Sequence, residues 1–240
     1  MGKLIVIDGL DGSGKETQAR LLQETLTKRG IRTRMLSFPR YGEKSAAAVE
    51  LYLSGALGAH AQDTGAYAAS VFFSVDRYIS YVTDWRADLA RADTVVIANR
   101  YTTANAVHQL SKMPRAEWDA FLQWLWDFEF DRLGLPRPDL AVYLCLEPAI
   151  SRGLIEARAE QTGRKMDIHE TDDAYLAGCY EAARYASKKL GWTEIHCSSG
   201  TEIRTRQSIA ADVLAAAEPL LRDCIKKENC HGISLLGKRI

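Results

Sequence analysis

Short apolar runs alternate along the chain with longer segments that carry apolar residues at helical spacing. The short runs predict five buried strands, at about residues 3–8, 31–38, 94–98, 140–146 and 193–197. The longer segments predict helices at about residues 14–29, 44–54, 65–92, 101–112, 115–133, 149–160, 172–190 and 205–227. Buried strands joined by helical crossovers form parallel sheets. We therefore expect an α/β fold, a five-stranded parallel sheet with helices on both faces.

The chain has 240 residues, and no repeat, low-complexity segment or linker divides it. A chain of this length can form one large α/β domain. We expect a single domain over residues 1–228 and a disordered tail over residues 229–240.

The stretch G-L-D-G-S-G-K-E-T at residues 9–17 joins the first predicted strand to the first predicted helix. Its glycines let the backbone curl so that N–H groups point at phosphate oxygens, and the helix adds its positive N-terminal end. Lys15 would reach the outermost phosphates. The alternative is an ordinary glycine-rich turn. We expect phosphate contacts from Gly9, Gly12, Ser13, Gly14, Lys15, Glu16 and Thr17.

Three arginines lie near the carboxyl ends of the strands. Arg40 and Arg100 follow the second and third strands, and Arg77 lies in the long helical segment between them. Parallel sheets place their ligands at this edge, where the glycine loop also lies. Because guanidinium groups match phosphate geometry, three of them here predict a second phosphate-bearing ligand. Taken singly, each arginine is more often a surface salt-bridge partner.

Composition narrows the range of partners. The formal net charge is zero and the sequence pI is about 7.0, which gives no electrostatic case for nucleic acid or a membrane. No apolar run approaches the roughly 18 residues of a membrane span. Because a strand is predicted from residue 3, we expect no secretory signal. The five cysteines are odd in number and widely spaced, as is typical of reduced thiols. We expect a cytoplasmic protein without nucleic-acid or membrane partners.

Together these motifs resemble the thymidylate kinases, a family of P-loop nucleoside monophosphate kinases. The matching pieces run in family order over about residues 3–190: G-L-D-G-S-G-K, F-P-R-Y, V-D-R, N-R-Y, L-G-L-P-R-P-D-L and an arginine-rich lid. The resemblance implies a P-loop NTPase architecture and transfer of phosphate from ATP to dTMP, giving dTDP, with Mg²⁺. It also implies a homodimer built from helices.

The resemblance further implies an acceptor site with separate parts for base and phosphate. Phe73 would stack on the pyrimidine ring, Arg77 would donate to a base carbonyl, and Asn105 would bond the base edge. Arg100 and Arg40 would hold the acceptor phosphate. The implied substrate-binding residues are Asp11, Phe38, Arg40, Tyr41, Phe73, Arg77, Arg100, Asn105 and His108.

A lid over about residues 149–171 is also implied. Some relatives carry an arginine directly after the aspartate of the glycine loop, but this chain has Gly12, so it resembles the members that place a catalytic arginine in the lid. The candidates are Arg152, Arg158 and Arg164, and we choose Arg158 because it lies mid-lid. The expected catalytic residues are Lys15, Arg100, Arg158 and Asp11.

Two positions depart from the family pattern at the metal site. Glu16 stands where Ser or Thr is usual, and Asn99 stands where Asp is usual. Together they resemble an exchange, a carboxylate gained at one position and lost at the other, which could still offer oxygen ligands to Mg²⁺. The alternative is drift in a non-catalytic nucleotide-binding module. A kinase for another nucleoside or nucleotide also stays open, because relatives often carry Tyr at His108.

The segment 115–133 is unusually aromatic and covers more than one helical face. Its surplus predicts a second apolar surface, such as a dimer interface, or simply a larger core. The residues are Trp118, Phe121, Trp124, Trp126, Phe128 and Phe130.

Overall fold

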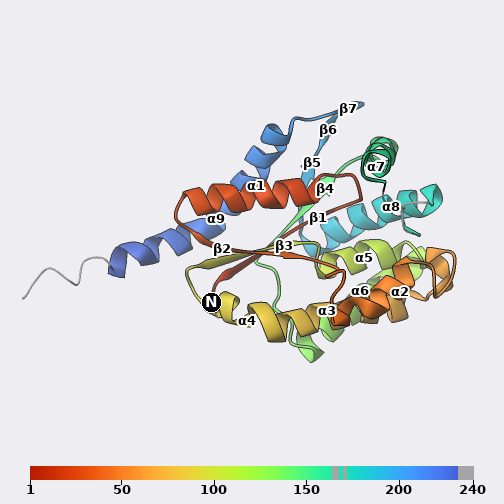
Figure 1. Cartoon of the computed structure of the whole chain (residues 1–240), viewed down its shortest axis with the longest axis horizontal. Coiled ribbons are helices and arrows are strands. Elements are labelled where there is room, and N and C mark those ends of the chain that lie inside the picture. Colours follow the sequence, from red (N-terminus) through yellow and green to blue (C-terminus); the bar gives the residue numbers. More distant parts are fainter. Residues whose placement is uncertain (164–167, 170–171, 232–240) are drawn as a thin grey trace, which may run out of the picture.

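A central sheet of five parallel strands, in the order β2-β3-β1-β4-β5, organises the molecule (Figure 1). The computed structural model describes residues 1–163, 168–169 and 172–231. The expected α/β fold with a five-stranded parallel sheet is confirmed. Each strand also begins and ends within one residue of its predicted position. The strands are β1 (Lys3–Gly9), β2 (Arg32–Ser37), β3 (Thr94–Asn99), β4 (Leu140–Cys145) and β5 (Thr193–His196).

Helices connect the strands and cover both faces of the sheet. The long predicted helices at 65–92 and 115–133 are interrupted by π-helical turns at Tyr81–Trp85 and Asp127–Arg132. The helices are α1 (Lys15–Lys28), α2 (Ala47–Leu53), α3 (Ala66–Ser80), α4 (Arg86–Ala90), α5 (Thr102–Leu110), α6 (Trp118–Trp126), α7 (Pro148–Thr162), α8 (Asp173–Leu190) and α9 (Arg206–His231).

Two features near the C-terminus differ from the prediction. β6 (Ser198–Ser199) and β7 (Glu202–Ile203) form a small antiparallel hairpin, whose strands are too short to leave an alternating pattern in the sequence. Helix α9 continues to His231, so its end includes the first residues of the expected tail, because good helix formers follow its core-facing part. Residues 232–240 lie outside the described residues.

Strand β1 shows why the sheet needs helices on both faces. Ile5 and Ile7 pack into a cluster with residues of α1 and α9, whereas Leu4 and Val6 pack on the opposite face with Trp85. Figure 1 shows α1 and α9 on one side of the sheet and α3 and α4 on the other. Successive strand residues point to opposite faces, so an unbroken apolar run is buried only if both faces are covered.

The aromatic residues of α6 mostly join a cluster shared with α3, α5 and α8. Trp118 and Phe121 are buried there, Trp124 and Trp126 are partly buried, and Phe128 stacks on Trp124 with 5.2 Å between ring centroids. This packing favours the larger-core interpretation of the aromatic segment.

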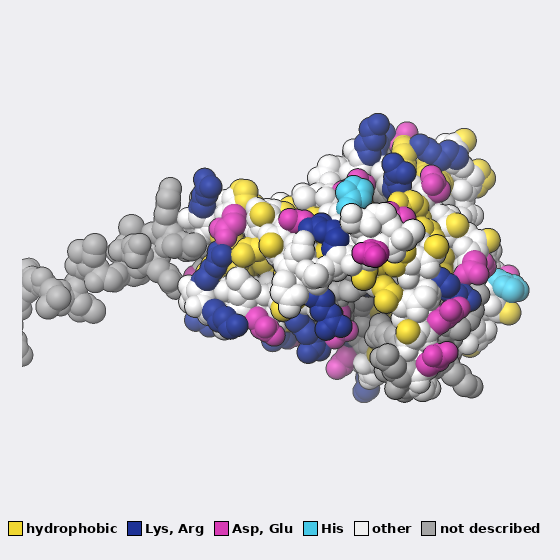
Figure 2. Space-filling view, turned by 90° about the horizontal axis from the view of Figure 1, so that it is seen from above, with side chains coloured by type: hydrophobic (Ala, Val, Ile, Leu, Met, Phe, Trp, Pro, Cys, Tyr) yellow, Lys and Arg dark blue, Asp and Glu magenta, His cyan; other side chains and the backbone are white. Residues whose placement is uncertain are grey.

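Basic and acidic side chains are interspersed over the face that carries α1 and α9 (Figure 2). The formal charge of zero is therefore spread out on this face rather than gathered in blocks of one sign. In the part of the chain that the structure describes, no helix combines the length and apolar character needed to cross a membrane.

Candidate active site

A cavity of about 680 Å³ opens at the carboxyl edge of the sheet, beside the glycine loop. Most of the residues expected in the site line it. They are Asp11, Gly12, Gly14, Lys15, Glu16, Thr17, Phe38, Tyr41, Phe73, Arg77, Asn99, Arg100, Asn105 and His108. Further lining residues that the sequence did not single out include Gln109, Leu154, His169 and Arg206.

The glycine loop has the conformation that its sequence predicts. Gly12 and Gly14 both have φ near +80°, a region that other residues rarely adopt. At Gly12 a Cβ atom would also come within 2.9 Å of the carbonyl oxygen of Ser151 on α7. The Ser151 hydroxyl donates to the carbonyl oxygen of Asp11, so the start of α7 is tied to the loop.

Two cations meet one carboxylate at the loop. Lys15 Nζ lies 3.0 Å from Asp11 Oδ1, and Arg100 Nη2 lies 2.5 Å from the same oxygen. Burial alone would raise the pKa of Asp11, but Arg100 and Lys15 hold that pKa well below its usual range. Burial, together with the charge of Arg100, lowers the pKa of Lys15. The end of the cavity beside the glycine loop, which we call the phosphate end, is thus compact and positive overall.

Arg100 combines an unusual backbone with a fixed side chain. It is a non-glycine residue with φ of 66°, and its N–H donates to the carbonyl of Ile7 at 3.1 Å. Strained backbone of this kind clusters at functional sites. Its Nη1 lies 2.8 Å from Nε2 of His108. Since guanidinium only donates, His108 accepts through Nε2 and is neutral, in agreement with a pKa that burial and the Arg100 charge lower far below its usual value.

The part of the cavity lined by Phe73, Arg77 and Asn105, which we call the base end, contains a buried polar network. Arg77 is 1% exposed, and its Nε and Nη2 donate to the two carboxylate oxygens of Glu129 at 2.8 and 2.5 Å. Asn105 Nδ2 donates to Glu129 Oε1 at 3.0 Å. Sequence reasoning missed Glu129; its only signal was a lone acid between Phe128 and Phe130.

Arg40 is outside the cavity lining. Its backbone N–H and its Nε donate to the buried carboxylate of Asp76 at 2.9 and 3.1 Å, and its Nη2 donates to Ser45 at 2.7 Å. Phe38 is buried and Tyr41 is 61% exposed. Asp76 lies within the V-D-R motif, and its contacts show that it anchors the segment after β2.

The two positions expected at the metal site have different surroundings. Asn99 donates through Nδ2 to Ser37 Oγ at 3.1 Å, while its Oδ1 is buried and has no hydrogen-bond partner among the residues that the structure describes. Glu16 forms an exposed ion pair with Arg20 at 2.9 Å on the first turn of α1. Asp8 was missed; it is buried at the end of β1 and accepts from Thr103 Oγ1 at 2.5 Å. Among the described residues, no three His, Cys, Asp or Glu side chains form a metal-binding group.

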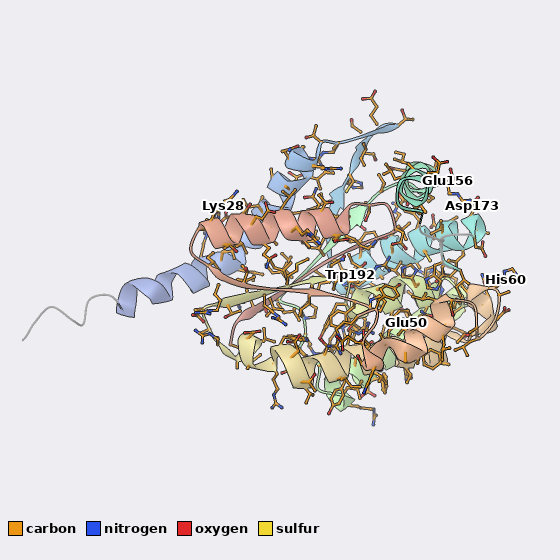
Figure 3. The ribbon with its side chains drawn as sticks, in the orientation of Figure 1. Lys28, Glu50, His60, Glu156, Asp173 and Trp192 are labelled. Atoms are coloured by element: carbon orange, nitrogen blue, oxygen red, sulfur yellow. The ribbon has the colours of Figure 1, made fainter. Side chains whose placement is uncertain are left out.

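The expected lid begins with α7. Arg152 bridges Glu156 on α7 and Asp173 at the start of α8, at 2.7 and 2.8 Å. Figure 3 labels these two acidic residues. The side chain of Arg158 and the whole of Arg164 lie outside the part of the chain that the structure describes.

His169 closes one wall of the cavity. Its ring stacks on that of His108, with centroids 5.0 Å apart and planes at 15°, and its Nε2 lies 2.7 Å from the hydroxyl of Tyr52. Burial and the nearby charge of Lys112 lower the pKa of His169 to about 3. Two neutral imidazoles are therefore stacked on each other in the wall of the cavity.

A glycine loop between β1 and α1, Arg100 beside it and a cavity that continues from the loop to Phe73 and Asn105 are the features of a P-loop nucleoside monophosphate kinase. The chain matches the family model for thymidylate kinase over residues 7–203, so it belongs to the thymidylate kinase family. Phosphorylation of dTMP to dTDP is the known reaction of this family.

Individual relatives agree with this assignment. The thymidylate kinase of Mycobacterium tuberculosis is 32% identical over 171 residues, covering 70% of this chain and 78% of that one. The human thymidylate kinase is 29% identical over 148 residues, covering 62% and 63%. The structure of a thymidylate kinase from Candida albicans superposes with a TM-score of 0.64 at 19% identity, covers 93% of each chain, and supports the fold.

Proposed function

We propose that this chain transfers the γ-phosphoryl group of ATP to dTMP with Mg²⁺, giving dTDP and ADP. The observation that carries the proposal is the single cavity, which continues from the glycine loop to Phe73, Arg77 and Asn105. A phosphate of ATP at the glycine loop can therefore face the phosphate of dTMP, while the base of dTMP occupies the far end of the cavity.

The phosphate end performs the transfer. The loop N–H groups and Lys15 bind the β- and γ-phosphates of ATP, and Arg100 holds the phosphate of dTMP. A phosphate oxygen of dTMP attacks the γ-phosphorus, and the bond from that phosphorus to the β–γ bridging oxygen breaks, so that the electron pair leaves with ADP. Asp11 lies within 3.0 Å of both cations and offsets part of their charge before substrate arrives.

The base end selects the acceptor. Phe73 stacks on the pyrimidine, Arg77 donates to a carbonyl of the base, and Asn105 bonds its edge. Phe38, Tyr41 and His108 line the same cavity and would contact the acceptor there. Arg40 acts near the acceptor phosphate from its place on Asp76.

Arg158 is our candidate for the lid arginine that neutralises charge on the transferring group. Arg152 is occupied by ion pairs to Glu156 and Asp173, whereas Arg158 lies further along the same helix. Replacing each by alanine tests the choice, with Arg152→Ala as the control. A larger fall in kcat for Arg152→Ala contradicts it.

The residues beside the loop suit Mg²⁺, which takes oxygen ligands. The unpartnered Oδ1 of Asn99 is a buried acceptor on a lining residue, and Glu16 supplies a carboxylate to the same cavity. Asn99 and Glu16 would hold the ion directly or through water, and Glu16 must first release Arg20. Bound Mg²⁺ neutralises phosphate charge.

We infer a homodimer that buries an apolar stripe on α3 and the turn after it. Each residue of this stripe is between 38% and 44% exposed, and their spacing places them on one helical face. Exposed apolar rows of this kind mark protein interfaces, and a self-complementary stripe suits a two-fold pair. Sedimentation as a monomer at micromolar concentration contradicts the inference. The stripe consists of Tyr67, Val75, Tyr78, Ile79 and Val82.

The cytoplasm is the location that we propose. Cys145, Cys179 and Cys197 are buried free thiols, which suits a reducing compartment.

A coupled ADP-release assay tests the reaction across nucleosides and nucleoside monophosphates, with and without Mg²⁺. We expect dTMP to give the highest kcat/KM, Mg²⁺ to be required, and Glu16→Ser to raise the Mg²⁺ concentration needed for half-maximal rate. A different preferred acceptor points to the kinase alternative raised by His108. No transfer to any acceptor, despite ATP binding, points to a non-catalytic module and overturns the proposal.

A further inference from the structure

Glu129 is a fully buried carboxylate outside the residues assigned so far. It lies in the π-helical turn after α6, and its side chain is 0% exposed. Its Oε1 accepts from Ser74 at 2.8 Å, and its Oε2 accepts from Thr102 at 2.6 Å. The two donors of Arg77 and the amide of Asn105 complete this set. A buried charge is costly unless it is paired and hydrogen-bonded, and here every interaction ends on residues around the base end of the cavity.

The pairing restricts Arg77 to one orientation. Nε and Nη2 are both used by the carboxylate in a bidentate arrangement. The remaining group, Nη1, lies 3.4 Å from the carbonyl oxygen of Tyr101, a long contact, and Arg77 lines the cavity. Arg77 therefore presents a donor to a ligand through Nη1.

The same carboxylate restricts the amide of Asn105. Its Nδ2 donates to Glu129 Oε1 at 3.0 Å and to the carbonyl oxygen of Ser70 at 3.2 Å, which uses both hydrogens. A flipped amide would place Oδ1 against two acceptors, one of them charged. Oδ1 is therefore the polar atom that Asn105 offers to the cavity, which it lines.

A donor beside an acceptor matches one class of base edge. A 4-oxo pyrimidine presents O4 as an acceptor and N3–H as a donor, which complement Arg77 and Asn105. A 4-amino pyrimidine presents an amino donor and a bare N3, the reverse at both atoms. Burying unmatched polar groups is what gives such sites their selectivity.

We propose that Glu129 is a positioning residue that sets this donor–acceptor polarity and thereby makes the site select 4-oxo over 4-amino pyrimidine nucleotides. The proposal rests on the proposed function, since it assigns the base to this end of the cavity. Glu129 touches no ligand itself; it acts through Arg77 and Asn105.

The test measures dissociation constants by calorimetry for dTMP and 5-methyl-dCMP, two nucleotides that differ only in the 4-oxo or 4-amino edge. Glu129→Gln keeps the shape but adds a donor, which lets the Asn105 amide turn over and leaves Arg77 without its counter-ion. We expect the dTMP preference to fall by about tenfold or more in this variant. Glu129→Asp keeps the charge but shortens its reach, and should shift the preference in the same direction by less.

Ser74→Ala is the matched control, because it removes one donor to the same carboxylate and leaves Arg77 and Asn105 in place. It should keep the wild-type preference. Because both ligands are measured on one preparation, the ratio of the two constants does not depend on the folded fraction. Should Glu129→Gln fail to fold, Glu129→Asp carries the test alone.

An unchanged ratio in the Glu129 variants that fold overturns the role of Glu129, even if their thermal stability falls. A wild type that binds dTMP selectively but transfers no phosphate contradicts the proposed function and leaves the binding test intact. A wild type without preference for the 4-oxo nucleotide overturns the polarity argument directly.

Discussion

The two ends of the cavity are built in different ways. At the phosphate end, Lys15 and Asp11 come from one loop, and their positions follow from the backbone of a single strand–loop–helix unit. At the base end, Arg77, Asn105 and Glu129 come from α3, α5 and the turn after α6, and side-chain hydrogen bonds hold them together.

This difference predicts different consequences of mutation. Charge on the phosphate end acts on the transferring group, so its loss should appear in kcat. The base end binds the acceptor equally before and during transfer, so its loss should appear in KM. The first two of the three experiments below test this division, and the third tests the buried histidine pair in the wall of the cavity.

The largest effect is expected at Lys15. Lys15→Ala removes the loop cation that meets the ATP phosphates and should lower kcat by roughly 10³-fold or more, as for other charges at phosphoryl-transfer sites. Steady-state kinetics at saturating dTMP measure it. Lys28→Ala is the control, since Lys28 is exposed at the far end of α1 (Figure 3). A Lys15→Ala enzyme within tenfold of wild type would refute the assignment.

Phe73 tests the base end. Phe73→Ala should raise the KM for dTMP by about tenfold, the scale of a lost base–aromatic stack, while kcat and the KM for ATP change little. Phe72→Ala is a close control, because Phe72 packs against the same cluster as Phe73 but is not among the cavity-lining residues. An equal rise in both variants would mean that packing, not stacking, is responsible.

The third effect falls on stability rather than on kinetics and is expected at the His108–His169 stack in the wall of the cavity. The pKa of His169 is lowered from the usual 6.5 to about 3 in the folded protein. Between these two pH values the unfolded chain binds a proton at His169 that the folded chain does not bind. Stability should therefore fall as pH falls from about 6.5 toward 3. His169→Phe keeps a ring but removes the titration.

Urea unfolding at pH 7, 6 and 5 measures this effect. The unfolding free energy of the wild type relative to His169→Phe should drop by roughly 1–2 kcal/mol between pH 7 and pH 5. His60→Phe, at an exposed surface position, is the control (Figure 3). A pH-independent difference would show that His169 is not buried as a neutral ring.

Much of the fold could be predicted because its signals are local. The runs at β1 and β3 are apolar at successive positions, which identifies strands covered on both faces. The spacing of glycines and lysine at residues 9–17 likewise depends on one short backbone path, so the loop and its place at the sheet edge follow directly.

The partners of the predicted arginines could not be predicted in the same way. The motifs containing Arg40 and Arg77 were recognised, but not that Asp76 holds the first and Glu129 the second. Likewise, Glu16 was expected beside a metal ion, and in the structure it pairs with Arg20. A charged residue leaves no periodic pattern that names its partner.

The sequence by itself determined the strands, the crossovers and the glycine loop, because hydrophobic periodicity and backbone freedom act over a few residues. Only the tertiary structure decided that residues 77, 105 and 129 share one carboxylate network and that His108 meets His169. The physical reason is that buried polar side chains are stabilised by whichever partners the packed elements bring within hydrogen-bonding distance, and that distance depends on the whole fold.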